Sequence, residues 1–262
     1  MSSLDLQSPR THWVQTPQGK LFAQQWSPAE AGGVPIILLH DSLGCVELWR
    51  DFPAQLAAAT GQQVIAYDRL GFGRSDAHPG VLRRGFVEAE ALEGFAALRE
   101  QLRIDEFVVF GHSVGGGMAV GCAAAYSGQC RGLITESAQA FVEDRTLEGI
   151  CAAARQFAGP GQLGRLQRYH GDKAAWVLRA WVDTWLGEDF ADWSLDALLP
   201  EVVCPLLSLQ GEEDEFGSRA HPERFVAMAG GPAVLRMLPG CGHVPHREQG
   251  TVVLDEVLRF LG

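Results

Sequence analysis

Short apolar runs alternate with longer segments of helical periodicity along most of this 262-residue chain. Near-continuous apolar strands that alternate with helices are typical of a parallel sheet covered on both faces. Pro17-Gln18-Gly19 is a turn signal between the first two runs, which predicts an antiparallel hairpin at one edge. We therefore predict an α/β fold with an eight-stranded, mostly parallel sheet. Its strands are expected at 12–16, 21–26, 35–39, 63–67, 107–110, 132–135, 205–209 and 233–238, and its helices at 49–59, 86–102, 114–125 and 252–261.

One stretch breaks this alternation, because the residues between the sixth and seventh predicted strands have helical texture and contain no good strand. We expect residues 141–199 to form a helical cap, inserted into a core domain made of residues 1–140 and 200–262. Four of the seven tryptophans fall in this segment, at positions 176, 181, 185 and 193. Most of its aromatic side chains are expected to pack the cap onto the core domain, and one or two are expected in a pocket wall.

The chain is acidic, with a formal net charge of −11 and a pI near 5.2. An acidic surface repels phosphate backbones and anionic lipids, so we expect no nucleic-acid or membrane partner. No apolar run approaches the ~20 residues that a membrane span needs. The N-terminus lacks the basic start and apolar middle of a signal peptide. These features predict a cytoplasmic protein whose six cysteines are free thiols, and they leave a homodimer open.

The most specific motif is Gly111-His112-Ser113-Val114-Gly115, which fits the G-x-S-x-G pattern of a nucleophile elbow. A predicted strand ends at 110 and a predicted helix begins at 114, which is the context that this motif requires. The tight turn strains the backbone of the nucleophile, and a Cβ atom two residues away on either side would clash with the following helix or the preceding strand. The motif therefore predicts Ser113 as a nucleophile at a helix N-terminus, where free N–H groups favour a developing negative charge.

A serine hydroxyl is a poor nucleophile until a base takes its proton. With this kind of elbow, the chain order is Ser, then Asp or Glu, then His. His243 lies in the glycine-rich loop directly after the last predicted strand, so we predict it as the base. His246 is the nearest rival, although we expect it to begin the last helix. His112 is expected to be structural, because it points away from the serine along the turn.

The acid should lie in the loop after the preceding strand, where four carboxylates are adjacent at positions 212–215. A triad acid must be buried and must hold the imidazole in one tautomer, which suits the short side chain of Asp214. Glu213 and Glu215 are the fallback candidates. Glu136, after the sixth predicted strand, is a remote alternative, because some enzymes of this kind place the acid there.

An oxyanion hole needs two backbone N–H groups. The N–H group of Val114 directly follows the nucleophile, and the loop after the third predicted strand should supply the second, which we assign to Ser42. His40 ends that strand and is expected to buttress the loop. The residues expected in the substrate pocket are His40, Trp181, Trp185 and Val244.

These features resemble the α/β-hydrolase superfamily over nearly the whole chain. The segment from Asp68 to Asp76 is similar to the family's D-x-R-G-x-G-x-S loop, with Leu70 inserted before Gly71. Cys204-Pro205 and Gly211-x-x-Asp214 resemble its approach to the acid, and Gly242-His243 with Glu248 resembles its ending. The likeness is greatest to small capped serine hydrolases, a subgroup of carboxylesterases, lactonases, C–C bond hydrolases and biphenyl-hydrolase-like esterases.

The chain departs from the family at Asp41, because the family usually has His-Gly where this chain has His40-Asp41. A carboxylate that pointed into the site would oppose the negative charge that develops in the oxyanion hole. We therefore expect the Asp41 side chain to point outward and to cap its loop.

The sequence predicts a serine hydrolase that cleaves a small ester, thioester or lactone through an acyl-enzyme intermediate, with no metal or organic cofactor. The aromatic cap suggests an apolar acyl or alcohol part. One alternative is a C–C bond hydrolase that acts on an aromatic ring-cleavage product. A cap arginine that points toward Ser113 would favour it, and the candidates are Arg155, Arg165, Arg168 and Arg179. An alternative of another class is a ligand-binding protein with this fold and little turnover.

Overall fold

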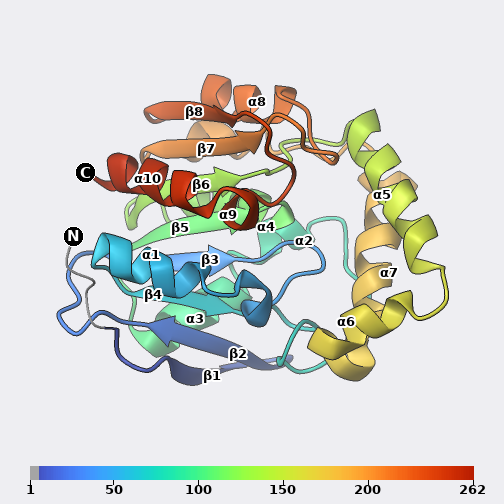
Figure 1. The fold of residues 1–262 in the computed structure, drawn as a ribbon, viewed down its shortest axis with the longest axis horizontal. Helices are drawn as coiled ribbons and strands as arrows, with labels where there is room; N and C mark the ends of the chain where they lie inside the picture. Colours follow the sequence, from blue (N-terminus) through green and yellow to red (C-terminus); the bar gives the residue numbers. More distant parts are fainter. Residues whose placement is uncertain (1–5) are drawn as a thin grey trace.

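Eight strands form one sheet, in the order β1-β2-β4-β3-β5-β6-β7-β8 (Figure 1). The structure, a computed structural model, describes residues 6–262. Most of the N-terminal segment on which the signal-peptide prediction was based lies outside the described residues. The strands are β1 (Arg10–Thr16), β2 (Gly19–Trp26), β3 (Ile36–Leu39), β4 (Val64–Tyr67), β5 (Phe107–His112), β6 (Cys130–Glu136), β7 (Leu206–Gly211) and β8 (Ala233–Leu238). All eight overlap the strands predicted from the sequence.

The antiparallel hairpin predicted at one edge is confirmed. β1 and β2 pair antiparallel, with Thr16 opposite Gly19, and β2 also pairs antiparallel with β4. From β4 to β8 all neighbouring strands are parallel. The carboxyl ends of the parallel strands therefore meet at one edge of the sheet, where α/β proteins place their functional loops.

Helices cover both faces of the sheet (Figure 1). On one face, α1 (Phe52–Thr60) and α10 (Gly250–Leu261) pack with the sheet in a buried apolar cluster that includes Leu56 and Val257. On the other face, α3 (Gly94–Leu102), α4 (Val114–Ala125) and α8 (Ala220–Met228) contribute Phe95, Met118 and Phe225 to a second cluster. This two-sided burial explains why the parallel strands are almost continuously apolar.

The single helix predicted over 86–102 is wrong in one respect, because the segment forms α2 (Phe86–Ala89) and α3 with a turn between them. Tertiary hydrogen bonds hold this turn. The Tyr126 hydroxyl donates to the Ala91 carbonyl at 3.0 Å, and the Tyr67 hydroxyl donates to Glu90 Oε1 at 2.6 Å. These partners lie far away in the sequence, so local periodicity could not reveal the break.

Three α-helices lie between β6 and β7 and form a layer at the right of Figure 1. They are α5 (Asp144–Phe157), α6 (Gln162–His170) and α7 (Ala174–Trp185). His170 anchors this layer to two loops of the sheet, because its Nδ1 accepts the Gly73 N–H at 2.9 Å and its Nε2 donates to the Leu43 carbonyl at 3.0 Å. Within the layer, α7 packs against both α5 and α6.

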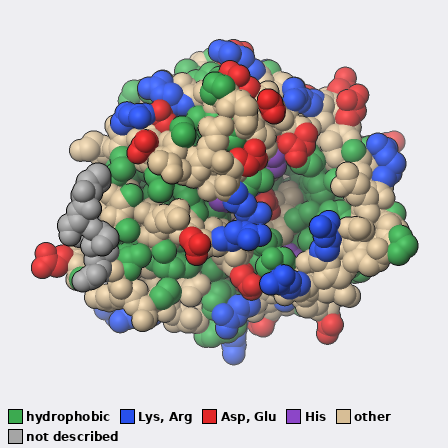
Figure 2. All heavy atoms as spheres, viewed as in Figure 1, with side chains coloured by type: hydrophobic (Ala, Val, Ile, Leu, Met, Phe, Trp, Pro, Cys, Tyr) green, Lys and Arg blue, Asp and Glu red, His purple; other side chains and the backbone are tan. Residues whose placement is uncertain are grey.

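Three further predictions concern surface charge, membrane spans and cysteines. Side chains of both charges are interspersed over the face shown in Figure 2. Among residues 6–262, the helices are all too short or too polar to cross a membrane. The six cysteines are free thiols, as predicted.

The strand order brings the predicted site loops together. β3 and β5 are neighbours, with Leu39 opposite Gly111, so the loop after β3 lies beside the loop after β5. β7 and β8 are also neighbours, with Gly211 opposite Leu238, so the loops that carry Asp214 and His243 are adjacent.

Candidate functional site

Ser113 lies on a strained corner between β5 and α4. Its backbone has φ 55° and ψ −127°, a region that residues other than glycine rarely adopt. The Ser113 N–H donates to the Glu136 carbonyl at 2.9 Å, and the Ser113 carbonyl accepts the Gly116 N–H at 2.8 Å. The corner therefore has the geometry of a nucleophile elbow.

Two glycines make this corner sterically feasible. A Cβ atom at Gly111 would lie less than 3.0 Å from the Gly115 backbone, and one at Gly115 would lie less than 3.0 Å from the Leu39 carbonyl oxygen. The close approach predicted for both positions is confirmed. The neighbour of Gly115 is the adjacent strand β3, however, and not the preceding strand β5, because α4 crosses over the end of β3.

Replacing Gly115 with alanine is expected to lower the free energy of unfolding by at least about 3 kcal/mol, because the new methyl group meets backbone that cannot move aside. Gly121 in the same helix is the matched control, since a Cβ atom there has its nearest neighbour at 3.7 Å. Gly121→Ala should be neutral or stabilising by up to about 1 kcal/mol. Urea unfolding of both variants measures the difference, and equal stability would contradict the steric account.

His243 and Asp214 form a direct pair in adjacent loops. Nδ1 of His243 lies 2.8 Å from Oδ1 of Asp214, whose side chain is fully buried. The same oxygen accepts the N–H groups of Phe216 and Gly217, and Oδ2 accepts the Gln210 amide at 2.7 Å. Because these contacts fix the carboxylate, its bond to Nδ1 leaves Nε2 of His243 as the nitrogen available to other groups.

The charge state of Asp214 follows from these contacts. Burial by itself would raise the pKa of Asp214, but the neighbouring His243 imidazole and the hydrogen bonds to the carboxylate outweigh it. The pKa of Asp214 therefore lies below its ordinary value, and the side chain is a carboxylate at neutral pH.

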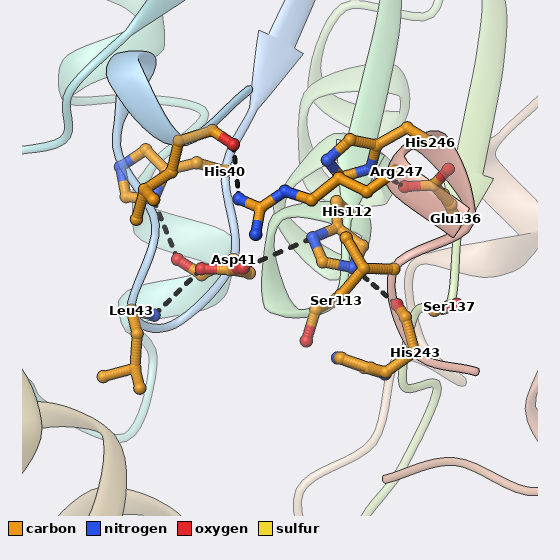
Figure 3. Close-up of polar contacts among 12 residues, drawn as sticks. His40, Asp41, Leu43, His112, Ser113, Glu136, Ser137, His243, His246 and Arg247 are labelled. Atoms are coloured by element: carbon orange, nitrogen blue, oxygen red, sulfur yellow. Dashed lines mark hydrogen bonds and ion pairs between the residues drawn. The ribbon is translucent and has the colours of Figure 1, made fainter. Parts of the chain in front are cut away.

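A cavity of about 140 Å³ brings Ser113 and His243 together. Figure 3 shows the Ser113 hydroxyl and the His243 ring on the same side of the site, facing one another. The Ser113 hydroxyl lies 3.5 Å from Oε1 of Gln139. The cavity wall is mostly apolar and consists of Asp41, Ser42, Leu43, Ser113, Gln139, Thr146, Ile150, Trp181, Trp185, Phe216 and His243.

The predicted pocket residues divide into two groups. Trp181 and Trp185 line the cavity, whereas His40 and Val244 do not lie among its lining residues in the described chain. His40 instead supports the loop after β3, which is the other role that the sequence analysis gave it. Its Nδ1 donates to the Asp41 carbonyl at 2.8 Å and its Nε2 accepts the Arg69 N–H at 3.2 Å.

The two predicted oxyanion donors lie on the same side of the site. Ser42 lines the main cavity, and both Ser42 and Val114 line a smaller adjoining one. Neither backbone N–H donates a hydrogen bond to another residue of the range 6–262. Both donors are therefore available to a ligand oxygen.

The expectation for Asp41 is half correct. Its Oδ1 accepts the Leu43 N–H at 3.0 Å, so the side chain caps its loop as expected. The side chain does not point away from the protein, however, because Oδ2 lies 3.5 Å from Nδ1 of the buried His112, although the side chain keeps 28% exposure. The attraction between these two groups explains the inward orientation (Figure 3).

The alternative base and acid pair with each other. His246 Nδ1 lies 2.6 Å from Glu136 Oε2, and both side chains are buried away from the cavity lining. His112, Glu136 and His246 offer ligand atoms within 4.8 Å of one another, the spacing of a metal site. The His112 nitrogens are both directed at oxygen atoms of other residues, so this cluster has the character of an ionic network.

Sequence reasoning missed several lining residues, among them Gln139, Thr146, Ile150 and Phe216. Phe216 had a detectable signal, because it follows the predicted acid by two residues; its ring packs edge-on against His243, with centroids 4.8 Å apart. Thr146 and Ile150 are spaced by one helical turn on α5, but only the packing of α5 shows that this face covers the site.

A family model described as "alpha/beta hydrolase fold" matches residues 34–248, which is most of the chain and includes every site residue discussed above. The chain belongs to the alpha/beta hydrolase family. Family membership agrees with the elbow, the strand order and the two-sided helical covering.

Two solved structures show how far the hydrolase fold extends over this chain. A proline iminopeptidase of Mycobacterium smegmatis matches 96% of this chain and 97% of its own, with a TM-score of 0.72 and 22% identity. A thermophilic esterase of Thermogutta terrifontis matches 96% of this chain and 98% of its own, with a TM-score of 0.71 and 23% identity. At these identities the likeness concerns the fold alone.

Among curated proteins, the mouse 1-acylglycerol-3-phosphate O-acyltransferase ABHD5 is 32% identical over 124 residues, which cover 47% of this hydrolase chain and 35% of the mouse protein. The match thus spans about a third of the length of that relative. Relatives with such different reactions do not by themselves identify a substrate.

Proposed function

We propose that this protein is a serine hydrolase that cleaves a small, uncharged ester, thioester or lactone through an acyl-enzyme. One observation carries this proposal: Ser113 and His243 line the same cavity, and Nδ1 of His243 contacts the buried carboxylate of Asp214. This set has the roles of nucleophile, base and orienting acid in the order that the elbow requires.

The chemistry would proceed in two halves. Nε2 of His243 takes the Ser113 proton as the hydroxyl oxygen attacks the substrate carbonyl, and Asp214 stabilises the resulting imidazolium. The N–H groups of Ser42 and Val114 hold the oxyanion. His243 then protonates the leaving group, and it later activates a water molecule that releases the acyl group.

The cavity suggests a short, apolar substrate. A volume of about 140 Å³ holds roughly five water molecules, which suits a short acyl or ring substituent better than a long lipid chain. Ile150, Trp181 and Phe216 supply apolar wall. The cavity is lined by no lysine or arginine of the described residues, which disfavours an anionic substrate.

Nothing in the cap specifically favours C–C bond cleavage. The four arginines that were candidates for an inward cation are all exposed and do not line the cavity in the described residues. An ester with neutral apolar parts therefore remains the better match to the cavity.

Trp181→Ala is expected to shift chain-length preference, because removal of the indole lengthens the cavity. The ratio of kcat/KM for p-nitrophenyl octanoate to that for the acetate should rise about tenfold. Trp176→Ala is the matched control, because this tryptophan lies on the same helix but packs against Phe72 and His78 outside the cavity. A similar shift in both variants would argue against the proposed acyl position.

The catalytic proposal is tested by a fluorophosphonate probe, which reacts with activated serines. Intact-mass analysis should show one adduct per chain, and peptide mapping should place it on Ser113. An unlabelled protein would favour the ligand-binding alternative.

A further inference from the structure

His112 connects the two loops that carry the proposed oxyanion donor and the proposed base. Its Nε2 lies 2.8 Å from the carbonyl oxygen of His243, and its Nδ1 lies 3.5 Å from Oδ2 of Asp41 (Figure 3). A carbonyl oxygen only accepts hydrogen bonds, so Nε2 of His112 carries a proton. The His112 ring is 2% exposed, whereas the Asp41 side chain at the other end of the contact is 28% exposed.

Four residues face His112, and the two carboxylates among them favour its cationic form. Asp41 faces it from the loop after β3 and Glu136 from the end of β6, whereas His243 and His246 face it from the loop after β8 and from α9 (Pro245–Glu248). A charge on His246 would oppose a charge on His112. The next residue of α9, Arg247, turns its guanidinium to the Leu48 carbonyl. Burial by itself would lower the pKa of His112, but the two carboxylates and the hydrogen bond to the His243 carbonyl together outweigh burial and raise it.

The His112 cation would offset the negative charge of Asp41 near the proposed oxyanion hole. Asp41 directly precedes the proposed oxyanion donor Ser42 and is one of the residues that line the cavity. Like charges repel, so an unpaired carboxylate beside this donor would oppose the oxyanion that forms during acyl transfer. The neighbouring His112 cation offsets that charge, while Oδ1 still caps the loop.

We propose that His112 is a positioning residue for the reaction, which acts as an imidazolium that neutralises Asp41 and holds the main chain of His243. The proposal rests on the proposed hydrolase function, but its charge claim can be measured without turnover. It also explains how this chain accommodates a carboxylate directly before the proposed oxyanion donor.

The test compares three variants with a neutral p-nitrophenyl ester. His112→Gln retains an amide donor for the His243 carbonyl and removes the charge, so kcat should fall about 100-fold. Asp41→Asn retains the oxygen that caps the loop and removes the charge, so kcat should fall much less than in His112→Gln, because neither charge is then required. The double variant should be about tenfold more active than His112→Gln, since no carboxylate is left unpaired. Additive losses in the double variant would overturn the proposal.

The pH profile adds a readout that a purely structural role would not change. Because the pKa of His112 is raised, the cation persists to higher pH than that of an ordinary histidine. The wild-type kcat should therefore fall as pH rises through this raised pKa and Asp41 becomes unpaired. Asp41→Asn should not show this fall, and a fall over the same pH range in this variant would contradict the proposed charge pair.

Ring 15N spectra of the histidines separate this proposal from the hydrolase assignment. In the inactive Ser113→Ala protein, His112 should carry protons on both nitrogens at pH 7, and on Nε2 alone once Asp41→Asn is added. A neutral His112 with Asp41 present would overturn the proposal whatever the enzyme hydrolyses. Thermal unfolding of each variant identifies any loss of activity that comes from a loss of fold.

Discussion

Replacing Ser113 with alanine is expected to lower kcat for a p-nitrophenyl ester by at least about 10⁴-fold and to leave the protein folded. The proposed pathway has no other nucleophile that could form the acyl-enzyme. Alanine also retains the Cβ atom and the backbone hydrogen bonds of the corner. Steady-state rates, with fluorophosphonate labelling of the same preparations, measure the effect.

Ser42→Ala is the matched control for this experiment. Ser42 lies on the wall of the same cavity, but its proposed contribution is the backbone N–H group, which alanine retains. The kcat of this variant should stay within about threefold of the wild-type value. Substantial activity in Ser113→Ala, or equal losses in both variants, would refute the assignment of the nucleophile.

Asp214→Asn is expected to lower kcat by about 10³- to 10⁴-fold, because an amide cannot stabilise the imidazolium as a carboxylate does. The amide nitrogen would also face the Gln210 amide, which now donates to Oδ2 at 2.7 Å. Glu213→Gln and Glu215→Gln are the controls, since both residues are exposed neighbours in the same loop. These two should retain near wild-type kcat, and a large loss in either would move the acid to that position.

The same variant should change the acid stability of the protein. Because the pKa of Asp214 is lowered in the fold, ionisation contributes stability above the ordinary aspartate value near 4, and this contribution is lost as pH falls through the lower folded value. Between about pH 5 and pH 2, Asp214→Asn should therefore lose less stability than the wild type. Urea unfolding across that range measures the slope.

Several features were predictable because they follow from short stretches of chain. The glycines at 111 and 115 reflect a local steric requirement, and the apolar runs of the strands reflect burial on both faces. Asp214 could be preferred over its acidic neighbours because only a short buried carboxylate suits its role, and in the structure it alone of the four is buried. The helix α8 was not predicted individually, although a helical segment between β7 and β8 was expected.

Other features were not predictable, because their partners are brought together only by folding. The break between α2 and α3 depends on tyrosines of β4 and of the turn after α4. Thr146 and Ile150 line the cavity because of how α5 packs, which no helical periodicity specifies.

The sequence by itself determined the sheet, the strained corner at Ser113 and the order of the loops that carry Asp214 and His243, because each of these depends on local backbone geometry and on chain order. Only the tertiary structure decided that Asp41 turns inward to meet His112, and that His112 in turn holds the His243 main chain. These groups come from two loops and the end of strand β5. Their pairing is set by charge and burial at short range, and those forces act only after the strands have brought the loops together.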